Sequence, residues 1–213
     1  SPRAAETALL GGFGLLMLGN GMQGSLIGVR AEIEGFSSSW TPIIMAAYFA
    51  GFLGGTKVAT RTLAQVGHIR VFAALASLAS SASLIYGIAL SPPVWIVLRL
   101  VSGMCLAGLY VVVESWLNAI TTNQTRGQLL AAYMMVSTAG IGIGQLLLNV
   151  ADPAKISLFI LASVLVSLSL IPIALSTTSA PPVEVPEPLS IRALYRLMPP
   201  GVVAAVLFAL NQG

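Results

Sequence analysis

Two ionised side chains, Arg99 and Glu114, stand inside the apolar stretches of this 213-residue sequence. An ionised group within a membrane-spanning helix costs about 3 kcal/mol or more, so such a residue usually faces a cavity or a partner. The two residues are 15 positions apart, which is roughly 22 Å along one helix. They cannot pair with each other, and each is a separate candidate site.

Arg99 is the first candidate, as a binding group for a solute. Its planar guanidinium matches a carboxylate or a phosphate. Alternating helix directions bring Asn20, Gln23, Tyr48 and Gln145 to a similar depth. Such a group could bind an anionic or polar solute or govern proton coupling. The alternative is a structural arginine that reaches outward and bonds to carbonyl groups of the first helix.

Glu114 is the second candidate, near the cytoplasmic end of the same helix. The basic residues nearest to it in the expected topology are Arg126, Arg70 and Arg61. An ion pair between Glu114 and this group would close the inner end of the bundle and act as a cytoplasmic gate. The alternative is a carboxylate that takes up and releases a proton, because no other acid lies within a predicted span.

Other classes of chemistry find little support in the composition. Cys105 is the single cysteine and lies in an apolar run, so we interpret it as a packing residue. The single histidine, His68, has no cysteine or carboxylate at a metal-ligand spacing, and we expect no metal and no cofactor. No paired catalytic groups lie at one depth, which argues against an enzyme. The net charge of +3 sits on loops and predicts no nucleic-acid partner.

Six apolar segments position these residues, and each is long enough to cross a bilayer as a helix, which takes roughly 20 residues. The runs are continuous rather than alternating, which excludes barrel strands. Charged residues make up only 8% of the chain, against about 25% in soluble domains. We expect an all-α integral membrane protein whose first segment is retained rather than cleaved as a signal peptide. The segments are 8–29, 40–60, 71–90, 94–120, 129–150 and 156–175.

Basic residues are distributed unequally between the two sets of helix ends. Seven lie on the side of the N-terminus and two on the opposite side. Cytoplasmic loops carry an excess of Lys and Arg, so we expect a multi-pass protein of the inner membrane with a cytoplasmic N-terminus. The seven are Arg3, Lys57, Arg61, Arg70, Arg126, Arg192 and Arg196, and the two are Arg30 and Lys155.

The chain changes character after residue 175. Residues 176–200 contain six prolines, which predicts an extended cytoplasmic linker that includes a short basic surface helix. Residues 201–213 begin a seventh apolar run that is too short to cross a bilayer. We therefore predict a six-helix domain over residues 1–175, a linker and an incomplete seventh helix.

Short words recur between the first three segments and the last three. Ala-Ala-Tyr at 46–48 recurs at 131–133, and Gly-Met at 21–22 recurs at 103–104. Because each copy holds an odd number of helices, the second copy would be inserted upside down. We expect a bundle of two inverted three-helix repeats, as in many secondary transporters. Chance recurrence of apolar words is the alternative.

Small residues within the segments predict how the helices pack. G-x-x-x-G pairs at 24–28, 51–55 and 140–144 allow neighbouring helices to approach closely. Serines at 77, 80, 81 and 83 are predicted to bond to carbonyl groups of their own helix.

Local motifs resemble those of the major facilitator superfamily. Segment 60–70 occupies the place of the family's G-x-x-x-D-R-x-G-R-R signature between the second and third helices. It keeps Gly67 and Arg70 but departs from the family's glycine, aspartate and arginine at 60, 64 and 65. Arg99 and Gly103 are similar to the R-x-x-q-G motif of the fourth helix. Glycines in the fifth helix are like the family's Gly-rich motif, without its proline.

Segments 111–115 and 126–136 look most like the YcaD-type branch of this superfamily, and the resemblance covers residues 8–213. It implies a protein of two six-helix halves, of which this is the N-terminal one. It also implies that a small solute binds near mid-membrane between the halves, that access alternates by rocking, and that protons are coupled to transport. An acid of the fourth helix, here Glu114, would hold the basic loop between the second and third helices.

A second interpretation belongs to a different class of protein. A chain that ended at residue 213 would hold half a cavity and could be a truncated structural subunit of a larger membrane complex, with no transport of its own. The departures from the loop signature favour this alternative, because they weaken the gating lock. The predicted partners are therefore the lipid bilayer, a small-molecule solute, and either a second six-helix half or a partner membrane subunit.

Overall fold

The computed structural model of the chain describes residues 2–122 and 124–175, all of which belong to one compact unit. These residues form helices joined by short loops, and no strand occurs among them. The predicted linker and seventh helix lie outside the described residues. The helices are α1 (Pro2–Ile33), α2 (Trp40–Val66), α3 (His68–Ile88), α4 (Pro92–Ile120), α5 (Arg126–Leu146), the 3-10 helix η1 (Leu147–Val150), α6 (Ser157–Leu168) and α7 (Leu170–Ala174).

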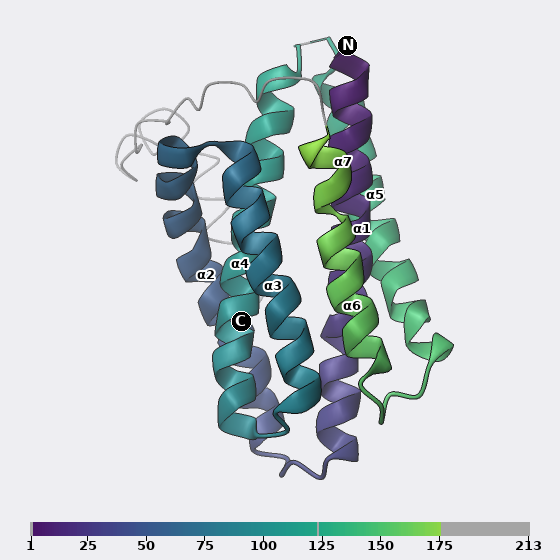
Figure 1. The fold of residues 1–213 in the computed structure, drawn as a ribbon. Helices are drawn as coiled ribbons and strands as arrows, with labels where there is room; N and C mark the ends of the chain where they lie inside the picture. The colour runs from purple at the N-terminus through teal and green to yellow at the C-terminus, as the bar shows by residue number, and fades with distance from the viewer. Residues whose placement is uncertain (1, 123, 176–213) are drawn as a thin grey trace, which may run out of the picture. The chain divides into compact units, whose positions relative to one another are not determined.

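The helices run up and down beside one another (Figure 1). The N-terminus, the α2–α3 joint, the α4–α5 loop and α7 lie at one end, which we call the N-terminal end. The α1–α2, α3–α4 and η1–α6 connections lie at the opposite end. Because α7 continues α6 after a break at Ser169, the two count as one helix. The all-α fold of six helices predicted from the sequence is thereby confirmed.

Five helices are long and apolar enough to cross a membrane by length and composition. They are α2, α3, α4, α5 continued by η1, and α6 continued by α7. α1 is helical over 32 residues, as predicted, but does not meet the same hydropathy test. The amide groups of Asn20 and Gln23 and several glycines lower its mean hydropathy. Five of the six predicted spans are therefore candidates by this measure, and the span in α1 stays a prediction.

Glycine lets two pairs of helices approach closely. On α2, Gly51 meets the backbone of α4 at Leu100, and on α5, Gly144 meets the backbone of α1 at Leu18. A methyl group at either glycine would overlap a carbonyl oxygen of the partner helix. Two of the three predicted glycine pairs thus pack helix against helix. The pair on α1 differs, because Gly24 faces open space.

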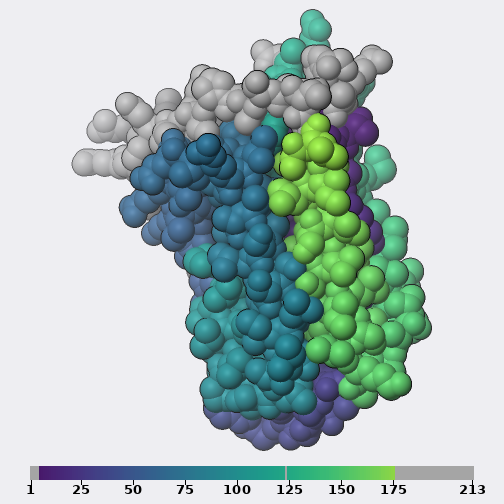
Figure 2. All heavy atoms as spheres, in the orientation of Figure 1, coloured from purple at the N-terminus to yellow at the C-terminus, as the bar shows by residue number. Residues whose placement is uncertain are grey.

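α3 and α6 lie side by side along one face of the bundle (Figure 2). Ser80 joins them, because its Oγ lies 2.7 Å from Ser163 Oγ and 2.9 Å from Ser167 Oγ. Ser81 and Ser83 bond to carbonyl groups four residues earlier on α3, as predicted. For Ser80 the prediction of a bond within its own helix is wrong, because its buried hydroxyl faces the serines of α6.

Apolar side chains point both inward and outward. Phe13, Phe72 and Trp116 are fully buried, whereas Leu53 on α2 and Ile88 on α3 are more than 70% exposed. Many exposed apolar side chains would favour aggregation in water. Lipid tails are as apolar as leucine, so this outer surface matches a bilayer.

Candidate functional site

α4 carries Arg99 about two turns inside its first residue, Pro92, at a position where 5% of the arginine is exposed. Arg99 Nη2 donates to the Gly24 carbonyl oxygen of α1 at 3.5 Å and to Met45 Sδ of α2 at 3.1 Å. Its Cζ lies 5.2 Å from the ring centroid of Tyr48 on α2, within the range of a cation–π contact. Three helices thus surround one guanidinium.

The charge of Arg99 has no counterion in the part of the chain that the structure describes. The one ion pair found there joins Arg30 and Glu34 at the C-terminal end of α1. Arg99 Nε is buried and has no hydrogen-bond partner. A guanidinium carries five N–H donors, and leaving a buried charge unpaired is costly. The arrangement lacks an acceptor, which an anionic or polar ligand could supply.

Gln23 of α1 brings a second under-satisfied polar group to this region. It is 8% exposed, and its Oε1 accepts a hydrogen bond from Ser83 Oγ on α3 at 2.9 Å. Its Nε2 is buried without a partner. The buried hydroxyls of Tyr86 and Ser102 lie one turn from Ser83 and Arg99 on α3 and α4. Sequence reasoning missed these hydroxyls, although their spacing of three residues places them on the same helix faces.

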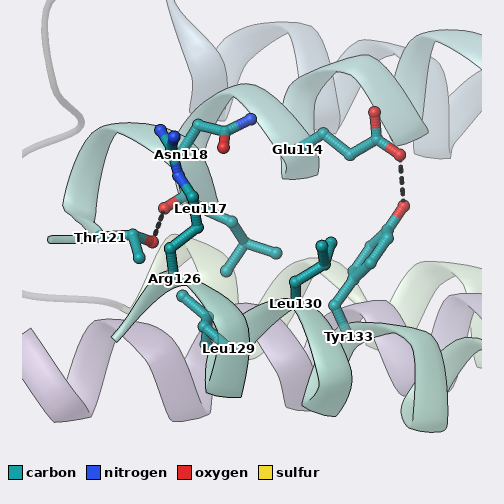
Figure 3. Close-up of a pocket in the computed structure, with 8 residues that line it drawn as sticks. All are labelled: Glu114, Leu117, Asn118, Thr121, Arg126, Leu129, Leu130 and Tyr133. Atoms are coloured by element: carbon teal, nitrogen blue, oxygen red, sulfur yellow. Dashed lines mark hydrogen bonds between the residues drawn. The ribbon is translucent and has the colours of Figure 1, made fainter. Parts of the chain in front are cut away.

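A pocket of about 510 Å³ lies between α4 and α5 at the N-terminal end of the bundle (Figure 3). Glu114 and Tyr133 lie at one end of it, where the Tyr133 hydroxyl donates to Glu114 Oε1 at 2.7 Å. Arg126 lies at the other end, with Asn118 and Thr121. The remaining lining residues are Leu117, Leu129 and Leu130.

Comparison with known proteins finds MFS-type transporters among the relatives of this chain. No family model matches the chain, and no solved structure does. The MFS-type transporter YcaD of Escherichia coli O139:H28 (strain E24377A / ETEC) is 28% identical over 189 residues, covering 89% of this chain and 50% of the relative. That of Shigella flexneri gives the same values. That of Escherichia coli O9:H4 (strain HS) is 32% identical over 141 residues, covering 66% of this chain and 37% of the relative.

The chain is a homologue of MFS-type transporters. The predicted resemblance to the YcaD-type branch is thereby confirmed. This homologue spans about half the length of the relatives it matches. With its five candidate spans it is a multi-pass membrane protein, and its relatives are transporters rather than enzymes.

In this MFS homologue, the described residues form no ion pair between Glu114 and the predicted gate arginines. Glu114 is bound by Tyr133 instead, while Arg126 begins α5 at the other end of the pocket. Arg61 and Arg70 are exposed on α2 and α3 and do not line the pocket. The expected pairing is therefore absent in this arrangement, because Tyr133 brings its hydroxyl to the carboxylate two turns along α5. The role of the four residues as a gate stays a prediction.

Asn20 and Gln145 form no hydrogen bond with Arg99 in the described part of the homologue. Asn20 is half-buried on α1, and Gln145 is exposed on α5. Neither side chain forms a hydrogen bond to a described residue. Their predicted contribution to a solute site stays a prediction, whereas Tyr48 does contact Arg99.

Two buried polar residues at helix ends were not predicted as contacts. His68 begins α3, is 1% exposed, and its Nε2 lies 3.1 Å from Ser115 Oγ on α4. At the opposite end of the homologue, Arg30 donates to the Pro153 carbonyl oxygen at 3.0 Å and pairs with Glu34 at 2.7 Å. The i,i+4 spacing of Arg30 and Glu34 was an available signal. The contact of His68 had none, because it joins residues distant in sequence.

Proposed function

We propose that the chain is the N-terminal half of a secondary transporter that moves a small anionic or polar solute by alternating access, coupled to protons. The observation that carries the proposal is the Arg99 guanidinium, which is buried in a spanning helix with no carboxylate partner among the described residues. Homology to half of the MFS-type transporter YcaD supports it. A second six-helix half would form the opposite wall of the solute site.

The proposed orientation puts the N-terminal end in the cytoplasm and the protein in the inner membrane. Its support is the distribution of basic residues over the described helices and loops, since such residues favour the cytoplasmic side. Five lie toward the N-terminal end, namely Arg3, Lys57, Arg61, Arg70 and Arg126, and two lie at the opposite end, namely Arg30 and Lys155.

Two matching backbone contacts support the proposed inverted repeats. Gly103 of α4 meets the backbone of α2 at Tyr48, and Gly21 of α1 meets the backbone of α5 at Ile141. These two glycines belong to the Gly-Met word that recurs in the sequence. Exchange of α1 with α4 and of α2 with α5 would carry one contact onto the other at the level of helix pairs, as a repeat requires. Tyr48 then falls on Ile141 and not on the Tyr133 of the recurring Ala-Ala-Tyr word.

In the proposed site, Arg99 holds an anionic group of the solute. Tyr48 supplies the aromatic face beside the guanidinium, and Gln23 supplies an amide N–H that has no partner in the bundle. Asn20 and Gln145 would extend the polar surface toward the second half. Charge-assisted hydrogen bonds from a planar guanidinium favour carboxylates and phosphates among small solutes.

The proposed gate consists of Glu114, Arg126, Arg70 and Arg61. Glu114 is the only acid within the five described candidate spans, so it is also the proposed proton carrier of this half. Its Oε1 accepts a hydrogen bond from Tyr133 in the present arrangement. Protonation would weaken this bond and release α5 from α4, which couples proton binding to movement of the inner end.

The test is solute-driven proton movement in proteoliposomes that contain the complete protein and a trapped pH-sensitive dye. Small carboxylates and phosphates are the probes. At least one should change the internal pH with the parent, and Arg99→Gln should abolish this response. Glu114→Gln should abolish proton movement while counterflow of labelled solute continues. Glu32→Gln is the matched control, because it neutralises an exposed acid outside the candidate spans.

Transport by Arg99→Gln at the parent's rate would refute the assignment of the solute site. A folded, monodisperse parent that moves no probe and no other small solute would refute transport altogether. That outcome would favour the structural-subunit alternative, for which the departures from the loop signature at 60, 64 and 65 are the supporting observation.

A further inference from the structure

The pocket between α4 and α5 has charged groups of opposite sign at its two ends. The hydrogen bond between Tyr133 and Glu114 fixes one level of the pocket. Thr121, which directly follows α4, and Arg126, the first residue of α5, lie at the other level (Figure 3). Glu114 and Thr121 are seven positions apart in the sequence, and so are Arg126 and Tyr133. Seven residues of a helix span about 10.5 Å, or two turns, which is the separation between the two levels. An acid at one end and a base at the other thus face a pocket two turns long.

The end of the pocket formed by Glu114 and Tyr133 has a free hydrogen-bond acceptor. Tyr133 occupies Oε1 of Glu114, and Oε2 forms no hydrogen bond with a described residue. A carboxylate held in place by one neutral donor can accept a charge-assisted bond from an ammonium group on its other oxygen. Glu114 is therefore oriented to receive a cation.

The middle of the pocket is apolar. Leu117, Leu129 and Leu130 line it between the two charged ends. The volume of about 510 Å³ falls within the range of roughly 300–1,000 Å³ that is typical of small-molecule sites. A hydrocarbon segment of a ligand would fit against these leucines, and Arg126 would meet an anionic group at the mouth.

We propose that this pocket binds a small zwitterionic molecule with a primary amine at one end, a carboxylate at the other and an apolar segment between them. The ammonium group binds Glu114, the apolar segment lies along the three leucines, and the carboxylate binds Arg126. This inference adds a ligand class to the proposed function and rests on it only for the idea that the ligand is a transported solute.

The order of charges distinguishes a free ligand from a phospholipid headgroup. Arg126 begins α5 and lies nearer the end of the bundle, while Glu114 lies deeper in α4. A zwitterionic lipid such as phosphatidylethanolamine has its phosphate deeper than its ammonium group. That order is opposite to the order in the pocket, so the geometry favours a soluble molecule that enters with its amine first.

The test is calorimetric titration of the purified protein in detergent with linear ω-amino acids of four, eight and twelve carbons. The eight-carbon member, whose extended length of roughly 10 Å matches the two-turn separation, should bind tightest. Octylamine and octanoate, which each carry one of the two charges, should bind about tenfold more weakly, since each forfeits one charge-assisted bond. Vesicles of phosphatidylethanolamine should not compete.

Two variants test the two ends of the pocket. Glu114→Gln and Arg126→Gln should each weaken binding of the eight-carbon probe by about tenfold, and Arg126→Gln should leave octylamine binding unchanged. The matched controls are Glu32→Gln and Lys57→Gln, which each remove one exposed charge that does not line the pocket. Circular dichroism checks that every variant is folded.

If the parent binds none of the three amino acids, the proposal is overturned. This part of the test uses the parent alone and so does not depend on the folding of any variant. Binding of the eight-carbon probe by Glu114→Gln and Arg126→Gln as tight as by the parent would overturn it as well. Displacement of the probe by phosphatidylethanolamine vesicles would also overturn it. Binding without uptake in proteoliposomes would uphold the pocket while removing transport of this ligand class. Uptake of other solutes without binding of these probes would uphold the proposed function and overturn the pocket.

Discussion

The contact between α2 and α4 gives the sharpest prediction for stability, at Gly103. A methyl group added there would overlap the carbonyl oxygen of Tyr48 and would lie 2.9 Å from its carbonyl carbon and 3.0 Å from the backbone nitrogen of Phe52. All three neighbours belong to the α2 backbone, so no side-chain rotation can make room. Gly103→Ala must therefore push α2 away from α4.

The magnitude follows from comparison with a second glycine. Gly142 on α5 has no atom within 4 Å of an added methyl group. In both Gly103→Ala and Gly142→Ala, alanine gains about 1 kcal/mol of helix propensity, so this gain cancels between the two variants. Overpacking costs about 1–3 kcal/mol and applies only to Gly103→Ala. We expect Gly103→Ala to be about 2 kcal/mol less stable than Gly142→Ala.

The assay is unfolding of each variant in mixed micelles, with increasing sodium dodecyl sulfate and detection of helix content by circular dichroism. Comparison of the two variants at one detergent composition gives the difference in the free energy of unfolding directly. Equal free energies for the two variants would refute the close contact between α2 and α4. A lower free energy for Gly142→Ala than for Gly103→Ala would contradict the assignment of the open face of α5.

Four further predictions concern three polar contacts and the orientation in the membrane. Ser80→Ala should lower the free energy of unfolding by about 0.6 kcal/mol, the average for hydrogen bonds between spanning helices; an unchanged value would contradict the α3–α6 serine contact. Arg30→Ala should lower it by about 1–2 kcal/mol, and an equal loss in Lys155→Ala would argue against the special role of Arg30. Arg99→Leu should keep the parent's free energy of unfolding within about 1 kcal/mol or raise it, while the solute response disappears; a larger loss of stability would support a structural arginine. An impermeant maleimide applied to intact cells should label Lys155→Cys but not Arg126→Cys, and the reverse pattern would invert the proposed orientation.

The existence of the helices could be predicted from the sequence because hydropathy is a property of composition. The segment predicted at 94–120 is α4 at Pro92–Ile120, and that predicted at 71–90 is α3 at His68–Ile88. Helix ends were less predictable. α1 covers Pro2–Ile33 rather than 8–29, because a helix continues beyond its apolar part as long as its backbone is hydrogen-bonded.

The partners of the candidate site residues were less predictable than their depth. Counting residues along a helix gives depth, and it correctly brought Tyr48 to the level of Arg99. It does not give the direction in which a side chain points around the helix. Glu114 was therefore paired with arginines at its own level, whereas the neighbouring helix brings Tyr133 to its carboxylate. Gln145 was likewise placed at a suitable depth, yet it is exposed on α5.

Arg99 tests how far the bundle itself can satisfy a buried cation. The structural interpretation predicted bonds to carbonyl groups of α1, and the structure contains one, to Gly24 at 3.5 Å, longer than the 2.7–3.2 Å typical of a hydrogen bond. Its other acceptor, Met45, offers a thioether sulfur, which is a weak acceptor. The Tyr48 ring adds about 2 kcal/mol. Desolvation of the charge costs several kcal/mol. The described residues therefore leave a deficit, and an acceptor from outside this bundle, in a solute or in a second half, is required to remove it.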